Sequence, residues 1–320
     1  MGMSYWPGIV RGRGNKMREL KGIVIPAVTP FDINGSLRLD WLASNIIKWN
    51  KTKVSGYMVL GSNGEFRSLG DDEAFEVIKT ASKVSAKDKL LIAGVGRESL
   101  YQTMQFIKKL ERDKVAIDYV SILTPGYFKS AMTDKVLIDY YQTIADNSSY
   151  PVLIYCAPKF ANGVCISRKA LQILADHPNI AGIKDTSSDM MEAYMEAVGG
   201  KTDFEVFSGS LGNIMSCLRQ GGKGGIISSA NYFPNTCAKL YELYEQKGIE
   251  GTMEYFNQLK QLAKHTGGSA GVAGVKDVMN MMGYAGGLPR KPVFPCDEAL
   301  HEEMQAYVKE HADWMIDTCP

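Results

Sequence analysis

The chain has 320 residues, of which 45% are hydrophobic and 22% are charged. This amount of apolar material can build a sizeable core, so general intrinsic disorder is excluded. Lysine and arginine number 36 against 35 aspartates and glutamates, which gives a formal net charge of +1. A nucleic-acid-binding protein usually gathers a basic surplus on one face, and this chain has no such surplus.

The sequence offers no segment suited to crossing a membrane. The longest stretch without a charged residue, Gly224 to Ala238, is too short and too rich in glycine, asparagine and proline. Residues 1–16 lack the apolar core of a secretory signal, so we expect an N-terminal extension over residues 1–20 and a cytoplasmic protein. The six cysteines form no CxxC pair and the four histidines have no zinc-type spacing, so neither a disulfide framework nor a metal site is expected.

From Lys21 onward, short apolar runs alternate with longer amphipathic segments. Each run is apolar almost throughout, as expected for a strand that is buried on both faces. The eight runs are Gly22–Val28, Gly56–Leu60, Leu90–Ala93, Tyr119–Leu123, Val152–Cys156, Ile180–Ile183, Phe204–Phe207 and Gly225–Ser228.

The segments between these runs have helical periodicity. In residues 71–84, apolar side chains recur at helical spacing behind an acidic start. Residues 133–145 show the same pattern, with Thr133 placed to cap the helix and Val136 in its apolar stripe. Ser167 is placed to cap the next helix in the same way.

Eight strands that alternate with helices predict an α/β fold, a (β/α)8 (TIM) barrel over residues 21–247. A doubly wound parallel sheet is the alternative, but it should carry a glycine-rich phosphate loop after its first strand. Pro30 and Phe31 stand at that place instead. Residues 248–320 contain helical patterns and no strand-like run, so we expect a C-terminal helical segment attached to the barrel.

In such a barrel the active site lies at the carboxyl ends of the strands, which makes Lys184 the most informative residue. It follows the apolar run Ile180–Ile183 and is expected to point into the barrel mouth. Burial there would lower the pKa of its amine and make it a nucleophile for Schiff-base chemistry. The alternative is a structural lysine that Asp185 or Glu65 neutralises.

Three other strand ends carry polar residues. Tyr155 either packs with its hydroxyl on a backbone carbonyl or transfers protons beside a charged neighbour. Ser62 and Asn63 lie in the turn Gly61–Glu65, which suits an anion such as a carboxylate but also fits an ordinary helix-capping turn. Ser208-Gly209-Ser210 is a second turn of this kind.

Together these pieces resemble the dihydrodipicolinate synthase/N-acetylneuraminate lyase superfamily of pyruvate-dependent class I aldolases. They follow the order and spacing of that superfamily from about Lys21 to Pro295, which is most of the chain. The matching motifs are Pro26-Ala27-Val28-Thr29-Pro30-Phe31, Gly61–Glu65, Thr124-Pro125-Gly126-Tyr127, Tyr155-Cys156-Ala157-Pro158, Gly182-Ile183-Lys184-Asp185, and Gly221–Ser228 followed by Asn231.

The resemblance implies a role for several of these residues. Lys184 would form the Schiff base with C2 of pyruvate or another 2-oxo acid, and Tyr155 would transfer protons at that carbon. Ser62 and Tyr127 would complete the relay, with Tyr127 reaching in from a neighbouring subunit of a homo-oligomer, a tetramer or dimer. Because the iminium on Lys184 is itself the electron sink, no metal or other cofactor is required. The substrate-binding residues would be Ser62, Asn63, Thr186 and Ile227.

The motifs also bear on the substrate. The synthase of lysine biosynthesis usually has Thr-Thr where this chain has Ser62-Asn63, and it carries an arginine shortly after the Tyr-x-x-Pro motif. Here Lys159 follows that motif, and a flexible ammonium does not reproduce a bidentate guanidinium. The Ser-Asn pair, Lys184-Asp185-Thr186 and Ser208-Gly209-Ser210 look more like 4-hydroxy-2-oxoglutarate aldolases. We therefore expect an aldolase that joins or separates a 2-oxo acid and an aldehyde.

Several alternatives stay open at this point. The first is 4-hydroxy-tetrahydrodipicolinate synthase, which condenses pyruvate with aspartate semialdehyde. N-acetylneuraminate lyase comes after it, because the residues that grip the polyol have no match here. A dehydratase or decarboxylase would share the same Schiff base, so only substrate profiling separates it. A catalytically silent binding barrel is disfavoured by the intact set Lys184, Tyr155, Ser62 and Tyr127.

Overall fold

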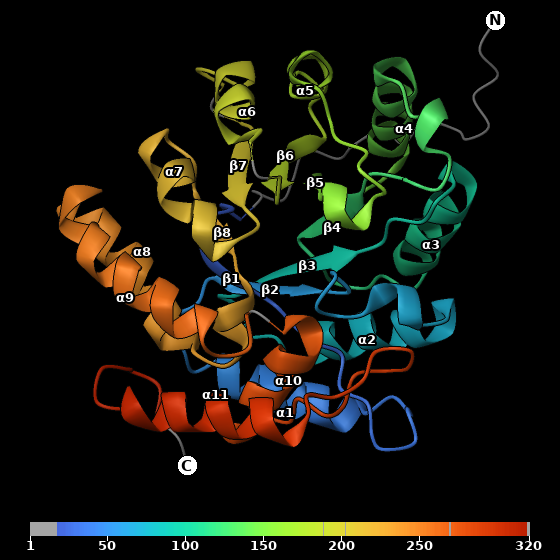
Figure 1. Cartoon of the computed structure of the whole chain (residues 1–320). Coiled ribbons are helices and arrows are strands. Elements are labelled where there is room, and N and C mark those ends of the chain that lie inside the picture. The colour runs from blue at the N-terminus through green and yellow to red at the C-terminus, as the bar shows by residue number, and fades with distance from the viewer. Residues whose placement is uncertain (1–17, 188, 202, 269, 319–320) are drawn as a thin grey trace, which may run out of the picture.

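The computed structural model describes residues 18–318, apart from residues 188, 202 and 269. Within these residues, eight parallel strands follow one another in chain order around a closed barrel, which β1 and β8 complete by pairing with each other (Figure 1). This closure confirms the (β/α)8 barrel and excludes the doubly wound sheet. The strands are β1 Gly22–Pro26, β2 Gly56–Val59, β3 Leu90–Gly94, β4 Tyr119–Leu123, β5 Val152–Cys156, β6 Ile180–Asp185, β7 Glu205–Ser208 and β8 Gly224–Ile226.

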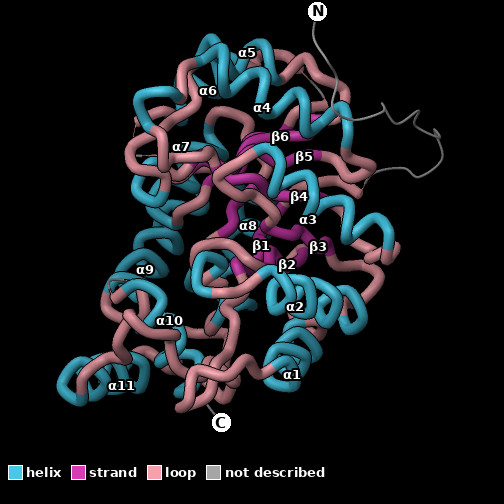
Figure 2. The backbone as a smooth tube through the Cα atoms, turned by 90° about the vertical axis from the view of Figure 1, so that its right-hand side faces the viewer, coloured by secondary structure: helices cyan, strands magenta, loops and turns pink. Residues whose placement is uncertain are grey.

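Helices surround the strands, as Figure 2 shows. Within the described residues, eight helices alternate with the strands and three more follow the barrel. The alternating helices are α1 Leu39–Trp49, α2 Asp71–Val84, α3 Leu100–Arg112, α4 Asp134–Asn147, α5 Arg168–Leu174, α6 Met191–Ala197, α7 Ile214–Arg219 and α8 Pro234–Lys247. The helices after the barrel are α9 Met253–Lys264, α10 Gly271–Met281 and α11 Glu298–Glu310.

The predicted apolar runs coincide with the strands, and nearly every strand residue is buried. One boundary differs in a way that matters for the site. The apolar run ends at Ile183, but β6 continues through Lys184 and Asp185. The strand continues because it still pairs with both neighbours: Lys184 lies in register with Tyr155 on β5 and with Phe207 on β7. The lysine therefore sits on the barrel wall itself and not on a loop beyond it.

The helix predictions are largely confirmed. Helix α2 has the predicted bounds, and the hydroxyl of Thr133 accepts a hydrogen bond from the backbone N–H of Val136 as the cap of α4. Ser167 caps α5 in the same way. The placement of Val136 in the apolar stripe is wrong, because its side chain is 40% exposed. It lies in the first turn, beside the cap, while later residues of α4 face the barrel.

The segment that follows the barrel returns to α1. The side chain of Asn45 on α1 both accepts a hydrogen bond from the backbone N–H of Ala285 and donates one to its carbonyl, at 2.8 and 2.9 Å. The ring of Trp49 lies 5.7 Å from that of Tyr284. Residues 1–17, most of the predicted extension 1–20, lie outside the described residues. Among the residues that the structure does describe, no helix has both the length and the apolar character needed to traverse a bilayer.

Candidate active site

Lys184 is a buried lysine on the inner wall of the barrel. Its side chain is 3% exposed, and its Nζ lies 3.7 Å from the Sδ of Met58 on β2. The same nitrogen lies 4.2 Å from the centre of the Tyr155 ring. Burial disfavours the charged ammonium and lowers the pKa of Lys184 to about 7. A substantial fraction of this amine is therefore neutral near pH 7 and available as a nucleophile.

The carboxylates that were candidates for neutralising Lys184 are engaged elsewhere. Asp185 faces the other side of β6, as alternation along a strand requires, and accepts hydrogen bonds from the backbone N–H and hydroxyl of Ser187 at 2.9 and 2.8 Å. Glu65 is paired with Lys276 instead, at 2.5 Å. Among the described residues no ion pair involves Lys184. The interpretation of Lys184 as one half of a buried salt bridge therefore does not hold.

Tyr155 is the neighbour of Lys184 across the β5–β6 ladder. Its hydroxyl lies 3.3 Å from the hydroxyl of Ser62, which comes from the turn after β2. Burial raises the pKa of Tyr155, and hydrogen bonds with Ser62 and Thr186 offset part of that rise. The phenol stays protonated at neutral pH and can donate or accept a proton through Ser62. Packing on a backbone carbonyl, the other interpretation of this tyrosine, is not what the structure shows.

The turn Gly61–Glu65 carries Ser62 and Asn63 between two anchored ends. Asn63 donates a hydrogen bond to the hydroxyl of Ser228 at 2.8 Å, so the turn after β2 touches the end of β8. Glu65 adopts a left-handed conformation with φ near 50°, and its carboxylate accepts a hydrogen bond from the backbone N–H of Arg290 at 2.8 Å. Two contacts therefore fix the turn: Asn63 binds Ser228 after β8, and Glu65 binds the segment that follows α10.

Two further predicted residues line the same end of the barrel. The hydroxyl of Thr186 donates a hydrogen bond to the carbonyl of Cys156 at 3.1 Å, directly after Tyr155. Ile227 is buried at the end of β8, and its backbone N–H already donates to the carbonyl of Val24 at 3.3 Å. Its carbonyl accepts a hydrogen bond from the backbone N–H of Ala230 at 3.2 Å, so both backbone groups of Ile227 have a partner.

Tyr127 stands apart from this cluster. Its side chain is 77% exposed, and its ring contacts that of the neighbouring Phe128, which is also exposed. Its backbone N–H donates to Glu98. Within this chain the structure brings Lys184 together with Tyr155 and Ser62, and does not bring Tyr127 to them. Entry of Tyr127 into the site of a neighbouring subunit stays a prediction.

The second glycine-serine turn is less available for an anion than its composition indicates. The hydroxyl of Ser208 donates to the carbonyl of Ser210 and accepts from its backbone N–H, at 2.7 and 3.3 Å. The backbone N–H of Gly209 donates to the carbonyl of Asp185 at 2.6 Å. The backbone N–H groups of Gly209 and Ser210 thus already have acceptors, one on β6 and one within the turn.

Sequence reasoning missed two residues that shape this end of the barrel. Met58 provides the apolar wall beside the amine, and its inward position on β2 is visible only once the strand register is known. Lys276 holds Glu65, and the signal was available: Lys276 and Asp277 interrupt the otherwise apolar residues 271–279. Such an interruption of an apolar helix face indicates a paired charge.

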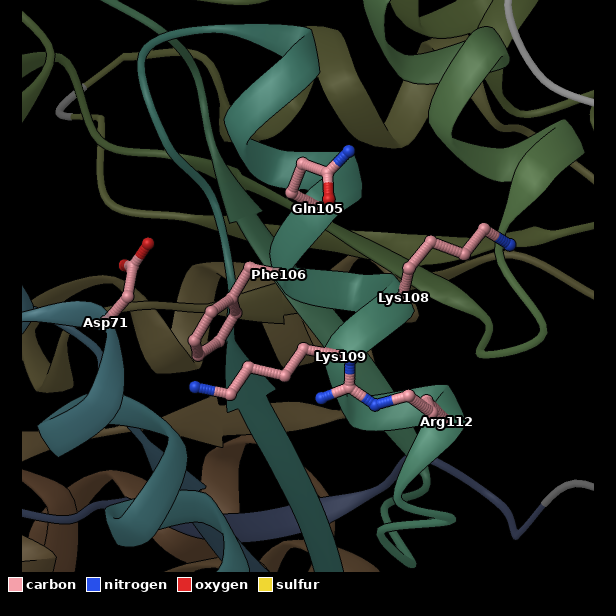
Figure 3. Close-up of a pocket in the computed structure, with 6 residues that line it drawn as sticks. All are labelled: Asp71, Gln105, Phe106, Lys108, Lys109 and Arg112. Carbon is pink, nitrogen blue, oxygen red and sulfur yellow. The ribbon is translucent and has the colours of Figure 1, made fainter.

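A surface hollow elsewhere on the molecule does not compete with this cluster. It lies on the outer side of the barrel, where Phe106 and Lys109 of α3 face Asp71 at the start of α2 (Figure 3). Lys109 is already paired with Asp72, and Arg97 with Asp71. The hollow therefore presents ordinary surface ion pairs between outer helices and none of the side chains that surround Lys184.

Comparison with known proteins places this arrangement in a family. The model of the Dihydrodipicolinate synthetase family matches residues 19–311. The chain is 29% identical over 302 residues to a protein of Coccidioides immitis provisionally named mitochondrial 4-hydroxy-2-oxoglutarate aldolase, covering 91% of this chain and 95% of that one. It is 32% identical over 248 residues to a 4-hydroxy-tetrahydrodipicolinate synthase of Thermodesulfovibrio yellowstonii, covering 76% and 82%.

A solved structure agrees on the fold. A dihydrodipicolinic acid synthase family protein from E. coli K12, solved in complex with pyruvate, superimposes with a TM-score of 0.81 over 91% of this chain and 98% of that one, at 23% identity. The family match spans nearly the whole chain, and the barrel is the one that the matching structure has. The chain belongs to the dihydrodipicolinate synthetase family and is a lyase of that family.

Proposed function

We propose that this protein is a Schiff-base-forming class I aldolase that makes or breaks a C–C bond between pyruvate, or a related 2-oxo acid, and an aldehyde. The observation that carries the proposal is the setting of Lys184. Its amine is buried, has a lowered pKa and contacts no carboxylate of the described residues, while a tyrosine–serine hydroxyl pair lies beside it. This is the environment that nucleophilic amine catalysis needs.

In this mechanism Lys184 attacks the C2 carbonyl of the 2-oxo acid. Tyr155 donates a proton to the departing oxygen, water leaves, and an iminium remains. In the cleavage direction the C–C bond β to the nitrogen then breaks, its electrons enter the iminium as an enamine, and the aldehyde departs. A proton returned to C3 and hydrolysis of the imine release the 2-oxo acid and the free amine. Ser62 relays protons to and from Tyr155, which it contacts at 3.3 Å.

The 2-oxo acid carboxylate is proposed to bind at the turn that carries Ser62 and Asn63, with Thr186 and the Ile227 backbone closing the pocket. Tyr127 is proposed to extend the proton relay from a neighbouring copy, since its ring is exposed and lies apart from Lys184, Tyr155 and Ser62 in its own chain. The active protein would then be a homo-oligomer. No metal or further cofactor enters the scheme, and a cytoplasmic location remains our expectation.

For the aldehyde partner we favour a 4-hydroxy-2-oxoglutarate type of reaction, in which the acceptor is glyoxylate. The Ser62-Asn63 pair and the Coccidioides immitis relative support this choice. The synthase that uses aspartate semialdehyde is the second candidate, because a relative of that name is 32% identical. Lys159 is the residue that bears on the choice: it is exposed on the loop after β5, where the synthase carries an arginine.

Borohydride trapping tests the proposal. The protein is incubated with pyruvate, reduced with borohydride, and analysed by intact mass and peptide mapping, while glyoxylate and aspartate semialdehyde are assayed in parallel as acceptors. We expect one reduced pyruvate adduct, on Lys184, and turnover with glyoxylate. Turnover with aspartate semialdehyde alone would assign the synthase reaction. A folded protein that traps neither pyruvate nor a larger 2-oxo acid would overturn the Schiff-base mechanism and favour a silent barrel.

A further inference from the structure

Two cysteine thiols meet directly behind the proposed catalytic tyrosine. Cys156 is the last residue of β5 and follows Tyr155, while Cys165 comes from the loop between β5 and α5. Their Sγ atoms lie 3.1 Å apart, and both thiols are free. The hydroxyl of Tyr194 on α6 lies 3.2 Å from one sulfur and 3.3 Å from the other, and it donates to the carbonyl of Ile166 at 2.6 Å.

The two thiols differ in reactivity. Cys156 is fully buried, whereas Cys165 is partly accessible. The hydrogen bond with Cys156 stabilises the thiolate of Cys165 and lowers the pKa of that residue, while the same contact and then burial raise the pKa of Cys156. The arrangement therefore pairs an accessible nucleophilic sulfur with a protonated sulfur behind it, which is how a reactive cysteine and a resolving cysteine are placed.

We propose that Cys156 and Cys165 are a reversible modification site, in which a peroxide converts the thiol pair to an intramolecular disulfide. The thiolate of Cys165 attacks the peroxide, the O–O bond breaks, and a sulfenic acid forms with release of the alcohol, or of water from hydrogen peroxide. Cys156 then attacks that sulfur, the S–O bond breaks, and water leaves as the S–S bond forms. The two thiols lose two electrons and two protons, and the peroxide is reduced.

Little movement is needed to close this bond. A disulfide has an S–S distance of about 2.05 Å, so the sulfur atoms must approach by only about 1 Å. The intervening loop contains Asn162 and Gly163 in left-handed conformations and can adjust at its exposed turn. Two other described cysteines have different surroundings: Cys217 contacts backbone carbonyls, and Cys237 contacts the hydroxyl of Ser229.

The position of the pair links oxidation to the site. The carbonyl of Cys156 accepts hydrogen bonds from the backbone N–H and hydroxyl of Thr186, and the preceding residue is Tyr155. Drawing Cys156 toward the loop therefore shifts the end of β5, which sets the distance from Tyr155 to Ser62. This second part of the proposal rests on the proposed function. A misplacement of this size in a catalytic group lowers kcat by up to about 10²-fold.

The modification itself is tested by mass spectrometry of the full-length protein. Hydrogen peroxide is added, free thiols are alkylated, and the protein is digested with trypsin without reductant. Cleavage after Lys159 separates the two cysteines into the peptides 136–159 and 160–168. We expect these two peptides to appear as one linked species that lacks two hydrogens, and to separate again after dithiothreitol. Peptides that stay separate, or Cys165 that proceeds to sulfinic acid unlinked, would overturn the proposal.

Two variants serve as controls. Cys165→Ser should abolish the linked species and make turnover insensitive to mild peroxide. Cys296→Ser removes a partly exposed cysteine elsewhere in the chain and should leave both the linkage and its effect on activity unchanged. If the linked, oxidised wild type keeps full activity, the coupling to Tyr155 is refuted.

The outcomes also separate this inference from the proposed function. Linkage without a borohydride adduct in either redox state would refute the Schiff-base mechanism and leave the thiol pair standing. An adduct on Lys184 in a protein whose two cysteines never form the disulfide would support the Schiff-base mechanism and refute the thiol pair.

Discussion

Two of the buried lysines differ in whether a carboxylate lies beside the amine. Lys184 on β6 and Lys276 on α10 are both almost fully inaccessible, and both place the amine over an aromatic ring, Tyr155 at 4.2 Å and Phe31 at 4.6 Å. Lys276 pairs with Glu65 at 2.5 Å and donates to the carbonyl of Leu288 at 2.8 Å. Lys184 has a thioether as its neighbour instead.

The missing carboxylate accounts for the different behaviour that we infer for the two amines. Burial lowers the pKa of Lys276 to about 8, and Glu65 offsets part of the lowering. Nothing offsets the effect of burial at Lys184, whose pKa falls to about 7. A paired buried lysine keeps its charge and holds two segments together, whereas an unpaired one gives up its proton and can react. Burial alone does not separate the two roles.

Removal of the reactive amine is expected to have the largest effect. Lys184→Ala should abolish turnover and the borohydride adduct, because no other buried amine faces Tyr155 in the described residues. Its stability should be unchanged or higher, since a buried polar amine has been removed. Steady-state assays and denaturant unfolding measure the two properties. Substantial activity in this variant would contradict the assignment.

Replacement of Tyr155, the aromatic neighbour of Lys184, is expected to have the second largest effect. Tyr155→Phe gives Lys184 the same kind of ring that Lys276 has, and removes the hydroxyl that contacts Ser62. If Tyr155 transfers protons, kcat should fall by roughly 10²–10⁴ while the adduct still forms. Ser62→Ala is the matched control and should lower kcat less, because the phenol remains. An unchanged kcat for Tyr155→Phe, measured on a folded sample, would assign a structural role to the ring.

Disruption of the pair between Lys276 and Glu65 should lower the stability of the protein and leave the reaction at Lys184 intact. Lys276→Met leaves the carboxylate of Glu65 buried without its partner, which should cost about 3–5 kcal/mol in the free energy of unfolding. Adding Glu65→Gln should recover part of that loss, and the folded fraction should still trap pyruvate on Lys184. Urea unfolding provides the measurement.

A surface pair gives the control for that experiment. Lys109→Met removes the exposed contact with Asp72 and should change stability little. If Lys276→Met is no more destabilising than Lys109→Met, the buried pair does not hold the turn.

The smallest expected effect is the change of kcat/KM with pH in the wild-type protein. Because the pKa of Lys184 is lowered to about 7, its amine is protonated and inactive below that pH and neutral above it. We expect kcat/KM to rise about tenfold per pH unit up to near pH 7 and then to level off. If kcat/KM keeps rising up to pH 9 or beyond, Lys184 has an ordinary pKa. The contrast drawn between Lys184 and Lys276 would then be wrong.

The strands of the barrel and the position of Lys184 could be predicted from the sequence because the barrel repeats one pattern. An apolar run buried on both faces identifies each strand, and a lysine at the end of such a run stands out. What the pattern could not give was contact across the fold. The partner of Glu65 lies on α10, far along the chain, so Asp185 and Glu65 both remained candidates for neutralising Lys184.

The remaining differences have local causes. Val136 fits the helical stripe by spacing, but it lies in the first turn of α4, beyond the reach of the core. The extension of β6 through Lys184 depends on hydrogen bonding to two neighbouring strands, which no single segment encodes. Tyr127 lies apart from Lys184 and Tyr155, and among the aromatic residues described its exposed ring contacts only Phe128.

The contact of Glu65 with Lys276 and Arg290 limits how this protein can be recombined with its relatives. An exchange of everything after the barrel looks like a simple graft of surface helices. It would in fact replace Lys276, whose side chain pairs with Glu65 in the turn beside Ser62, and a graft without a basic residue at that place would leave the carboxylate buried and unpaired. A functional hybrid must therefore inherit Glu65 and a basic residue at the position of Lys276 together, or neutralise Glu65 at the same time.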